Sequence, residues 1–373
     1  MQRKQTEQII KDLEKKIVFI VGPRQVGKTW LSKEIGKKYE KTVYLSYDRF
    51  EDREIIVKEQ WLKETELLIF DELRKMDNWK NYLKGVYDTK EKNLKILVTG
   101  SARMETFRQT GDSLAGRFYI HRLLPFSLSE LEKSEFADID RLMERGGFPE
   151  PFLADDEITA NRWRKQYIDG LIRTDILDFE QIHDLRAMQT VFELLRRGVG
   201  SQVSFNSIAR DVEISPTTVK KYIEILEALF IVFRVVPYSK NIARSIIKEP
   251  KIYFYDNGLV EGDAGQKFEN FAAVSLLKHI LAKNDYLGQS NELKYLRTKN
   301  GQEVDFALTN SKNEIDVILE VKNSDNELSK NLKYFSDKYD LNGIQLVKNL
   351  KREGEIGKIK ILSAEGYLWG LFM

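Results

Sequence analysis

The run Ile17-Val18-Phe19-Ile20-Val21, followed at once by Gly22-Pro23-Arg24-Gln25-Val26-Gly27-Lys28-Thr29, decides the fold of the first part of this chain. A short apolar run without polar interruptions is typical of a β-strand that is buried on both faces. The residues after it match the pattern G-x-x-x-x-G-K-[ST], whose glycines let backbone N–H groups curl around a phosphate. A helix that begins near Lys28 adds the positive end of its dipole. The strand in front of the motif favours a phosphate-binding loop over a plain glycine turn.

The loop also predicts how a nucleotide and its metal ion are held. Lys28 is expected to reach the β- and γ-phosphates, and Thr29 is expected to give its hydroxyl to Mg²⁺. ATP and Mg²⁺ are the cofactors that the sequence predicts. The residues expected to contact the nucleotide are Gly22, Pro23, Arg24, Gln25, Val26, Gly27, Lys28, Thr29 and Trp30.

A second apolar run, residues 67–70, ends in the acidic pair Asp71-Glu72. Parallel α/β sheets place their chemistry at the carboxyl ends of the strands. We expect Asp71 to hold Mg²⁺ through water, and Glu72 to orient and deprotonate the water that attacks the γ-phosphate. Two acids at a strand end are by themselves more often solvated than catalytic. Their place after a phosphate-binding loop favours the catalytic interpretation.

Three further strands are expected in this part of the chain, at residues 42–47, 95–101 and 118–123. If the strand at 95–101 lies between the loop strand and the Asp71 strand, Ser101 can hydrogen-bond the γ-phosphate or the attacking water as a sensor. The strand at 118–123 would then be the last one on the other side. An inserted strand together with a catalytic Glu72 favours a hydrolase over a nucleotide kinase.

Arg117 follows a glycine directly before the last predicted strand. From there it could stabilise charge on a γ-phosphate of its own subunit or of a neighbouring one, which would require a homo-oligomer. An arginine on the surface fits the same position equally well.

Composition limits the classes of protein that remain. The 60 basic and 58 acidic residues leave a net charge of +2, so any contact with nucleic acid must come from local patches. Cysteine is absent and only three histidines occur, which leaves a structural zinc site without ligands. The chain begins without an apolar leader, and the apolar run at 229–236 is short and interrupted by Arg234. We expect a cytoplasmic protein without a membrane segment.

Residues 205–229 have the spacing of a helix-turn-helix, in which Ser215 caps the second helix and Pro216 is its first residue. Apolar segments at 230–236 and 251–255 could form a wing. The polar residues expected to face DNA are Thr217, Thr218, Lys220 and Lys221, with Lys240 and Arg244 near phosphates. The alternative is a winged helix that only packs against protein.

The last hundred residues contain a candidate metal site. Period-two geometry places Glu320 and Lys322 on one face of a strand at 317–322. With Asp305 from the neighbouring strand and Glu269 from a preceding helix, they resemble the PD-(D/E)XK nuclease site, in which carboxylates hold Mg²⁺ and lysine assists the attacking water. The alternatives are a salt-bridged sheet edge and a nuclease fold without activity.

The whole series of motifs resembles one family. GPRQVGKT, LLIFDELRKMDNW, ILVTGSAR, SLAGRF, LLPFSLSEL and GGFPEPF, in this order, are similar to the archaeal and bacterial AAA-type ATPases that carry a C-terminal domain of unknown function. The resemblance implies an ASCE-class P-loop core, a small helical lid, a winged helix and a restriction-endonuclease-like end. We place these parts at residues 1–124, 125–200, 201–260 and 261–373, all within an α/β fold.

Two functions follow from this organisation. The first is Mg²⁺-dependent ATP binding and hydrolysis that drives a conformational change of a DNA-associated winged-helix and nuclease-like module. The alternative is a nucleotide-gated protein-binding or signalling switch, in which the nuclease-like part is an inactive scaffold.

Overall fold

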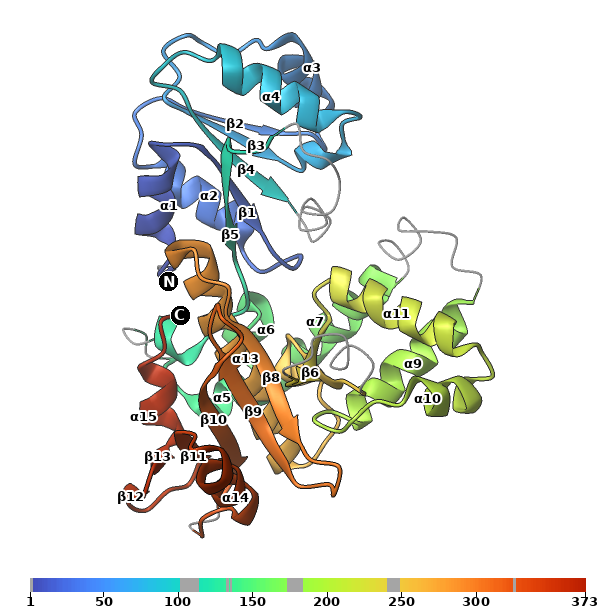
Figure 1. The fold of residues 1–373 in the computed structure, drawn as a ribbon. Coiled ribbons are helices and arrows are strands. Elements are labelled where there is room, and N and C mark those ends of the chain that lie inside the picture. The colour runs from blue at the N-terminus through green and yellow to red at the C-terminus, as the bar shows by residue number, and fades with distance from the viewer. Residues whose placement is uncertain are drawn as a thin grey trace. The chain divides into compact units, whose positions relative to one another are not determined.

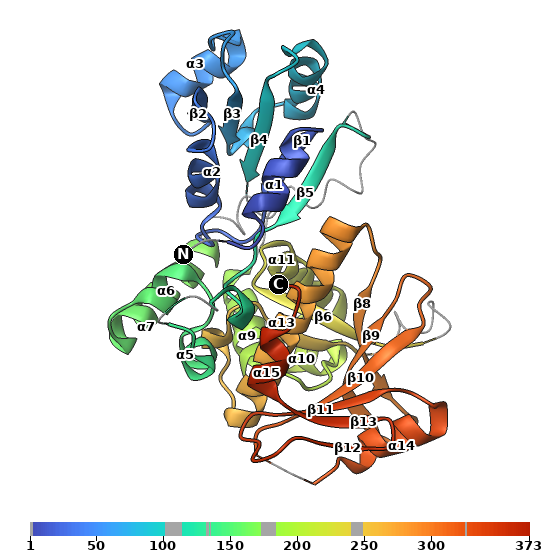
Figure 2. The same cartoon turned by 90° about the vertical axis from the view of Figure 1, so that its left-hand side faces the viewer.

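The structure is a computed structural model that describes residues 3–100, 114–131, 134, 136–172, 184–239, 249–324 and 327–373. The chain forms two compact units, Met1–Leu124 and Pro125–Met373 (Figures 1 and 2). None of the helices in the described ranges is both long and apolar enough to span a membrane.

The first unit is a parallel sheet with the strand order β2-β3-β4-β1-β5. Its strands are β1 (Ile17–Val21), β2 (Thr42–Ser46), β3 (Leu67–Asp71), β4 (Lys95–Gly100) and β5 (Phe118–Arg122). Its helices are α1 (Thr6–Leu13), α2 (Lys28–Gly36), α3 (Phe50–Lys58), the short η1 (Leu73–Lys75) and α4 (Trp79–Thr89). The structure confirms that β4 lies between β1 and β3 and that β5 is the edge strand beyond β1.

Burial on both faces explains why β1 is apolar throughout and why β3 is apolar up to Asp71, its last residue. Every residue of both strands is buried. On one face, Phe19 and Phe70 pack into a core with Leu83 of α4 and Ile56 of α3. Helices α1 and α2 contact β1, β3 and β4. Because the strands are parallel, Val21, Asp71 and Gly100 end at the same edge of the sheet.

The second unit is built on an eight-stranded sheet with the order β12-β13-β11-β10-β9-β8-β6-β7. The strands are β6 (Val232–Pro237), β7 (Lys251–Phe254), β8 (Glu292–Arg297), β9 (Glu303–Thr309), β10 (Ile315–Lys322), β11 (Gly343–Val347), β12 (Gly354–Ile356) and β13 (Ile359–Ser363). The helices are η3 (Leu128–Glu130), α5 (Ile139–Arg145), α6 (Pro149–Leu153), α7 (Glu157–Gly170), α9 (Leu185–Arg197), α10 (Phe205–Val212), α11 (Pro216–Ala228), η5 (Asn257–Leu259), α13 (Ala264–Leu287), α14 (Lys330–Tyr339) and α15 (Ala364–Trp369).

Local signals in the second unit behave as the sequence predicts. Helix α11 begins at Pro216, and the Ser215 side chain accepts a hydrogen bond from the Thr218 N–H. Helix α13 begins after Asp263, whose carboxylate and the Gln266 side chain form a capping box.

Residues 125–373 form one compact unit, and the domain boundaries expected at residues 200 and 260 stay predictions. Strand β6 pairs with β7 in an antiparallel ladder, and Val236 and Pro237 at its end pair in parallel with Lys294 and Tyr295 of β8. Helix α13 contacts β7, β8 and β10. Residues on both sides of position 260 therefore share one sheet and one covering helix.

Candidate active site

The phosphate-binding loop needs glycine at Gly22 and Gly27. Gly22 has φ +152° and Gly27 has φ +97°, a region that side chains rarely adopt. A Cβ atom at Gly22 would lie 2.1 Å from the Leu123 carbonyl oxygen. The chain directly after β5 thus runs so close to the loop that only glycine fits at Gly22, and α2 begins directly after Gly27.

Lys28 is buried at the start of α2, and its ammonium group lies within the loop. Its Nζ atom donates to the carbonyl oxygens of Gly22, at 3.0 Å, and Pro23, at 2.5 Å. Burial lowers the pKa of Lys28 to about 8, against the opposing effects of the Glu72 and Asp71 carboxylates. A bound polyphosphate would give this ammonium a charged partner in place of neutral carbonyl groups.

Asp71 accepts hydrogen bonds from three hydroxyl groups. Thr29 Oγ1 lies 3.1 Å from its Oδ2 atom, and the Tyr44 hydroxyl lies 2.5 Å from the same oxygen. Thr99 donates to the other carboxylate oxygen. Thr29 and Asp71 thus present hard oxygen ligands side by side, which fits a Mg²⁺ ion held by the hydroxyl and, through water, by the carboxylate.

Tyr44 is a contact that the sequence analysis did not find. It lies on β2, next to β3, and burial raises its pKa well above the ordinary value, an effect that Asp71 reinforces. The only signal in the sequence is a tyrosine near the end of a strand, which does not specify a neighbour. Tyr44 and Thr99 together fix the carboxylate from both sides.

Glu72 follows β3 in the left-handed conformation, with φ +55°. Its N–H donates to the Thr99 carbonyl oxygen at 3.1 Å, and its Oε2 atom accepts from Arg74 Nε at 2.9 Å. The Glu72 side chain is 21% exposed and that of Arg74 is 12% exposed. Arg74 therefore holds one oxygen of the expected catalytic base, a role that the sequence analysis did not assign.

Arg117 lies at the end of the sheet where the parallel strands begin, whereas the phosphate-binding loop lies at the end where they finish. The carbonyl oxygen of Arg117 accepts from the N–H of Ile17, the first residue of β1, at 3.0 Å. Five residues of β1, at about 3.3 Å each, separate this end from the loop. Its guanidinium group pairs with Asp88 at 2.8 and 3.1 Å. The expected role of Arg117 in its own subunit is therefore corrected, because the side chain cannot reach that site. A role in a neighbouring subunit stays a prediction, and Ser101 lies outside the described residues.

The expected metal ligands of the second unit are divided into two groups with Asp305 between them. Glu269 accepts from the Tyr253 hydroxyl at 2.6 Å and lies 3.3 Å from Lys251 Nζ. Glu320 pairs with Lys322 and accepts from Ser329 Oγ, both at 3.1 Å. The pair of Glu320 with Lys322 confirms that they share one face of β10.

Asp305 contacts both groups without joining them into a metal site. Its Oδ2 atom accepts from the Val321 N–H at 2.9 Å, while Oδ1 lies 3.7 Å from Lys251 Nζ. Burial raises the pKa values of Glu269 and Glu320 to about 7, and the charge of Asp305 adds to both shifts. In the part of the chain that the structure describes, no three acidic or histidine side chains are arranged to hold a metal ion. The expected set of Glu269, Asp305 and Glu320 does not fit a metal, because a lysine occupies the space between two of its members.

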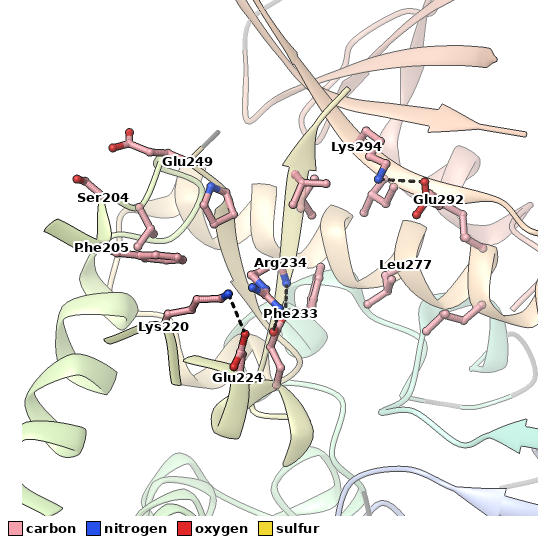
Figure 3. A pocket seen from close by; sticks show the side chains of 18 of the residues that line it. Ser204, Phe205, Lys220, Glu224, Phe233, Arg234, Glu249, Leu277, Glu292 and Lys294 are labelled. Carbon is pink, nitrogen blue, oxygen red and sulfur yellow. Dashed lines mark hydrogen bonds and ion pairs between the residues drawn. The ribbon is translucent and has the colours of Figure 1, made fainter. Parts of the chain in front are cut away.

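A hollow of about 850 Å³ lies in the second unit, where α11, β6, α13 and β8 meet (Figure 3). Lys220 and Lys294 on its wall pair with Glu224 and Glu292, at 3.8 and 3.0 Å. Arg234 pairs with Glu227 at 2.6 Å. These three cations are compensated by glutamates, so they offer little net positive charge to a phosphate.

The helix-turn-helix residues expected to face DNA lie at the start of α11. Thr217, Lys220 and Lys221 are exposed, and the Thr218 hydroxyl is 2.8 Å from that of Ser215. Lys240 and Arg244, the expected phosphate contacts, lie outside the described residues.

Comparison with known families agrees with the phosphate-binding site. Residues 14–132 match the family described as AAA domain. Residues 136–266 and 264–365 match two domains of unknown function, DUF8612 and DUF4143. The chain thus combines an AAA domain with the carboxyl-terminal domain DUF4143, which confirms the resemblance drawn from its motifs.

The most similar relatives include uncharacterized proteins of bacteria and archaea. One from Methanocaldococcus jannaschii is 25% identical, covering 82% of this chain and 75% of the relative. One from Haemophilus influenzae is 22% identical, covering 89% and 92%. One from Mycobacterium tuberculosis is 26% identical, covering 65% of this chain and 55% of the relative, so this chain spans about half of it.

Two solved structures are also similar. The Walker-type ATPase of Pyrococcus abyssi gives a TM-score of 0.46 at 14% identity, covering 69% of this chain and 94% of that protein. The RuvB Holliday junction branch migration motor of Thermotoga maritima gives 0.32 at 17% identity, covering 62% and 88%.

Proposed function

We propose that this protein hydrolyses ATP with Mg²⁺ at the site formed by the loop of β1 and the ends of β3 and β4. The observation that carries the proposal is the adjacency of Thr29, Asp71 and Glu72, in which the threonine hydroxyl bonds the first acid and Arg74 holds the second. Phosphate binding alone would not require Glu72 to be placed and held in this way.

The chain's own groups account for each step of hydrolysis. Lys28 and the backbone N–H groups of the loop bind the β- and γ-phosphates, and Mg²⁺, when bound, neutralises charge on them. The free oxygen of Glu72 accepts a proton from water while the water oxygen forms a bond to the γ-phosphorus atom. The bond between this phosphorus and the bridging oxygen breaks, and ADP leaves with the electron pair. Phosphate and a protonated Glu72 remain, and the base later returns its proton to solvent.

We further propose that the second unit responds to the nucleotide and works on DNA. Support comes from the order of its elements, because α9, α10 and α11 followed by the β6–β7 pair is the order of a winged helix. Helix α13 followed by β8, β9 and β10 has the order of the nuclease-like fold that the motifs imply. Lys220 and Lys221, near the start of α11, are exposed, and Lys220 pairs with Glu224 on the same helix.

A second candidate function is a nucleotide-gated switch that binds a protein partner and cuts nothing. The observation that favours it is the ammonium group of Lys251, which lies among the carboxylates of Glu269, Glu303 and Asp305. This arrangement does not fit a metal-dependent nuclease. The exposed start of α11 fits a protein surface as well as it fits DNA.

One experiment separates these functions. ATP turnover is measured alone and with single-stranded, duplex and branched DNA, with Glu72→Gln as the inactive control. Stimulation by any form of DNA supports the DNA-linked ATPase. Turnover that is indifferent to all three supports the protein switch, and absence of turnover in the wild-type protein rejects hydrolysis itself.

A further inference from the structure

Lys251 is a buried lysine in a cluster of carboxylates. It is the first residue of β7, and its side chain is 3% exposed. Its Nζ atom lies 2.8 Å from Glu303, 3.3 Å from Glu269 and 3.7 Å from Asp305. Lysine is almost never buried unless it is paired. Here it is paired with acids from both α13 and β9.

Several further side chains hold Lys251 and its carboxylate partners in place. The Tyr253 hydroxyl donates to Glu269, and the Tyr295 ring lies 5.6 Å from the ammonium group. Gln202 donates to Glu303, at 3.3 Å. Gly200 lies against the Glu269 carboxylate, since a Cβ atom there would be 2.9 Å from both oxygens. Segments that are far apart in the sequence, from Gly200 before α10 to Glu303 in β9, thus pack around the ammonium group of Lys251 and its carboxylates.

The ammonium group keeps its charge in this position. Burial alone would lower the pKa of Lys251, but Glu269, Asp305 and Glu303 together raise it above the ordinary value. The carboxylates are more exposed than the lysine, at 18 to 23% against 3%. The lysine therefore lies deeper in the protein than the acids. A cation approaching from solvent would meet carboxylates that are already paired with the Lys251 ammonium group.

The charges of the whole cluster nearly balance without a metal. Glu320 has Lys322 as its partner, and Glu303 has Arg297 in addition to Lys251. Four carboxylates, those of Glu269, Glu303, Asp305 and Glu320, thus face three basic side chains. A divalent cation added here would be repelled by Lys251.

We infer that Lys251 takes the place that a divalent cation has in a nuclease-like site, so that this cluster ties the second unit together instead of binding metal. The lysine is part of β7, which precedes the domain boundary expected near residue 260, and it links this strand to α13 and β9, which both follow that boundary. The inference is independent of ATP hydrolysis, which uses residues of the first unit.

The test measures thermal unfolding of the full chain without nucleotide, with and without Mn²⁺. Wild-type protein and Asp305→Asn should show the same response to Mn²⁺. Lys251→Ala should unfold about 6 to 20 °C lower without metal, because it leaves buried carboxylates unpaired. Mn²⁺ should restore part of this loss, and Lys251→Ala combined with Asp305→Asn should not be restored. Lys294→Ala, which removes a surface lysine paired with Glu292, is the matched control and should change little.

A second measurement decides the matter if Lys251→Ala does not fold. Mn²⁺ binding is followed by electron paramagnetic resonance in the full chain carrying Asp71→Asn, which removes the carboxylate expected to hold a metal ion in the first unit. Binding that is unaffected by Asp305→Asn and Glu320→Gln supports the inference. A saturable Mn²⁺ site that disappears with either substitution overturns it, as does a wild-type thermal shift that depends on Asp305.

Discussion

Among single residues, Lys28 connects ATP binding to pH. Its pKa is lowered to about 8 in the buried loop, so at pH 9 about nine tenths of the protein carries a neutral amine. ATP should bind the charged form, because its phosphates interact with an ammonium group. We therefore expect full affinity below pH 8, a loss of about tenfold per pH unit above it, and proton uptake on binding at pH 9.

Calorimetric titration at pH 7 and pH 9, in buffers of different ionisation enthalpy, measures both effects. Equal affinity at the two pH values, without proton uptake at pH 9, would show that the amine is charged throughout.

The two acids at the end of β3 should have different phenotypes. Glu72→Gln should leave ATP bound and lower turnover by about 10² to 10⁴, because an amide holds water without accepting its proton. Asp71→Asn should instead raise the Mg²⁺ concentration needed for half-maximal turnover. Steady-state kinetics with a Mg²⁺ titration of both variants checks this, and exchanged phenotypes would reverse the assigned roles.

Arg74 is expected to position Glu72. Its Nε atom bonds one carboxylate oxygen at 2.9 Å and leaves the other for water. Losing a charge-assisted hydrogen bond should lower turnover about 10- to 100-fold in Arg74→Ala, while ATP affinity stays the same.

Arg74→Lys serves as the matched variant, since it keeps the charge and should recover part of the rate. Unchanged turnover in Arg74→Ala, or turnover in Arg74→Lys as low as in Arg74→Ala, would reduce Arg74 to a packing role.

The residues that sequence reasoning found and those it missed differ in a physical way. Lys28 and Thr29 belong to one turn of chain, where spacing alone fixes geometry. Tyr44 and Lys251 act on partners that are distant in the chain, and only the folded sheets, with helix α13 in the case of Lys251, bring them together. Arg74 is two residues from Glu72, but this contact depends on the left-handed backbone at Glu72, which the sequence does not predict.

At the level of elements, the parallel sheet of the first unit was predictable because β1 and β3 are separate apolar runs, the first followed by the phosphate-binding motif and the second ending in acids. The place of β4 between β1 and β3 was only a condition at the level of sequence, because the order of strands depends on pairing between distant segments. The arrangement of the second unit was not predictable in the same way. Its sheet joins β6 to β8 through Val236 and Pro237, and nothing in the local pattern marks that pairing.

The edge of the first sheet gives a prediction for Arg117. Its guanidinium group pairs with Asp88 at the end of the sheet where the strands begin, far from the phosphate-binding loop. Arg117→Ala should therefore keep wild-type ATP turnover in a monomer. ATP turnover per subunit is measured over a range of protein concentrations. A loss of turnover that appears only where the wild-type rate rises with concentration would instead support a role in a neighbouring subunit, and a loss of about 10³ would be typical of such an arginine.

For the whole molecule, the shared sheet predicts which fragments fold. A fragment of residues 125–373 keeps Lys251 beneath Glu269, Glu303 and Asp305, and it keeps β6 against β8. A fragment of residues 261–373 lacks the lysine and both strands. Breaking a buried ion pair costs about 3 to 5 kcal/mol, a large part of the roughly 5 to 15 kcal/mol that stabilises a domain.

We therefore expect cooperative thermal unfolding and a near-ultraviolet circular dichroism signal for fragment 125–373, and neither for fragment 261–373. Replacing the acids in the short fragment by Glu269→Gln, Glu303→Gln and Asp305→Asn should recover part of its stability, because neutral side chains no longer need the missing ammonium group. A short fragment that unfolds cooperatively with its acids intact would place a true domain boundary near residue 260. It would also show that Lys251 is not needed to hold the acidic cluster together.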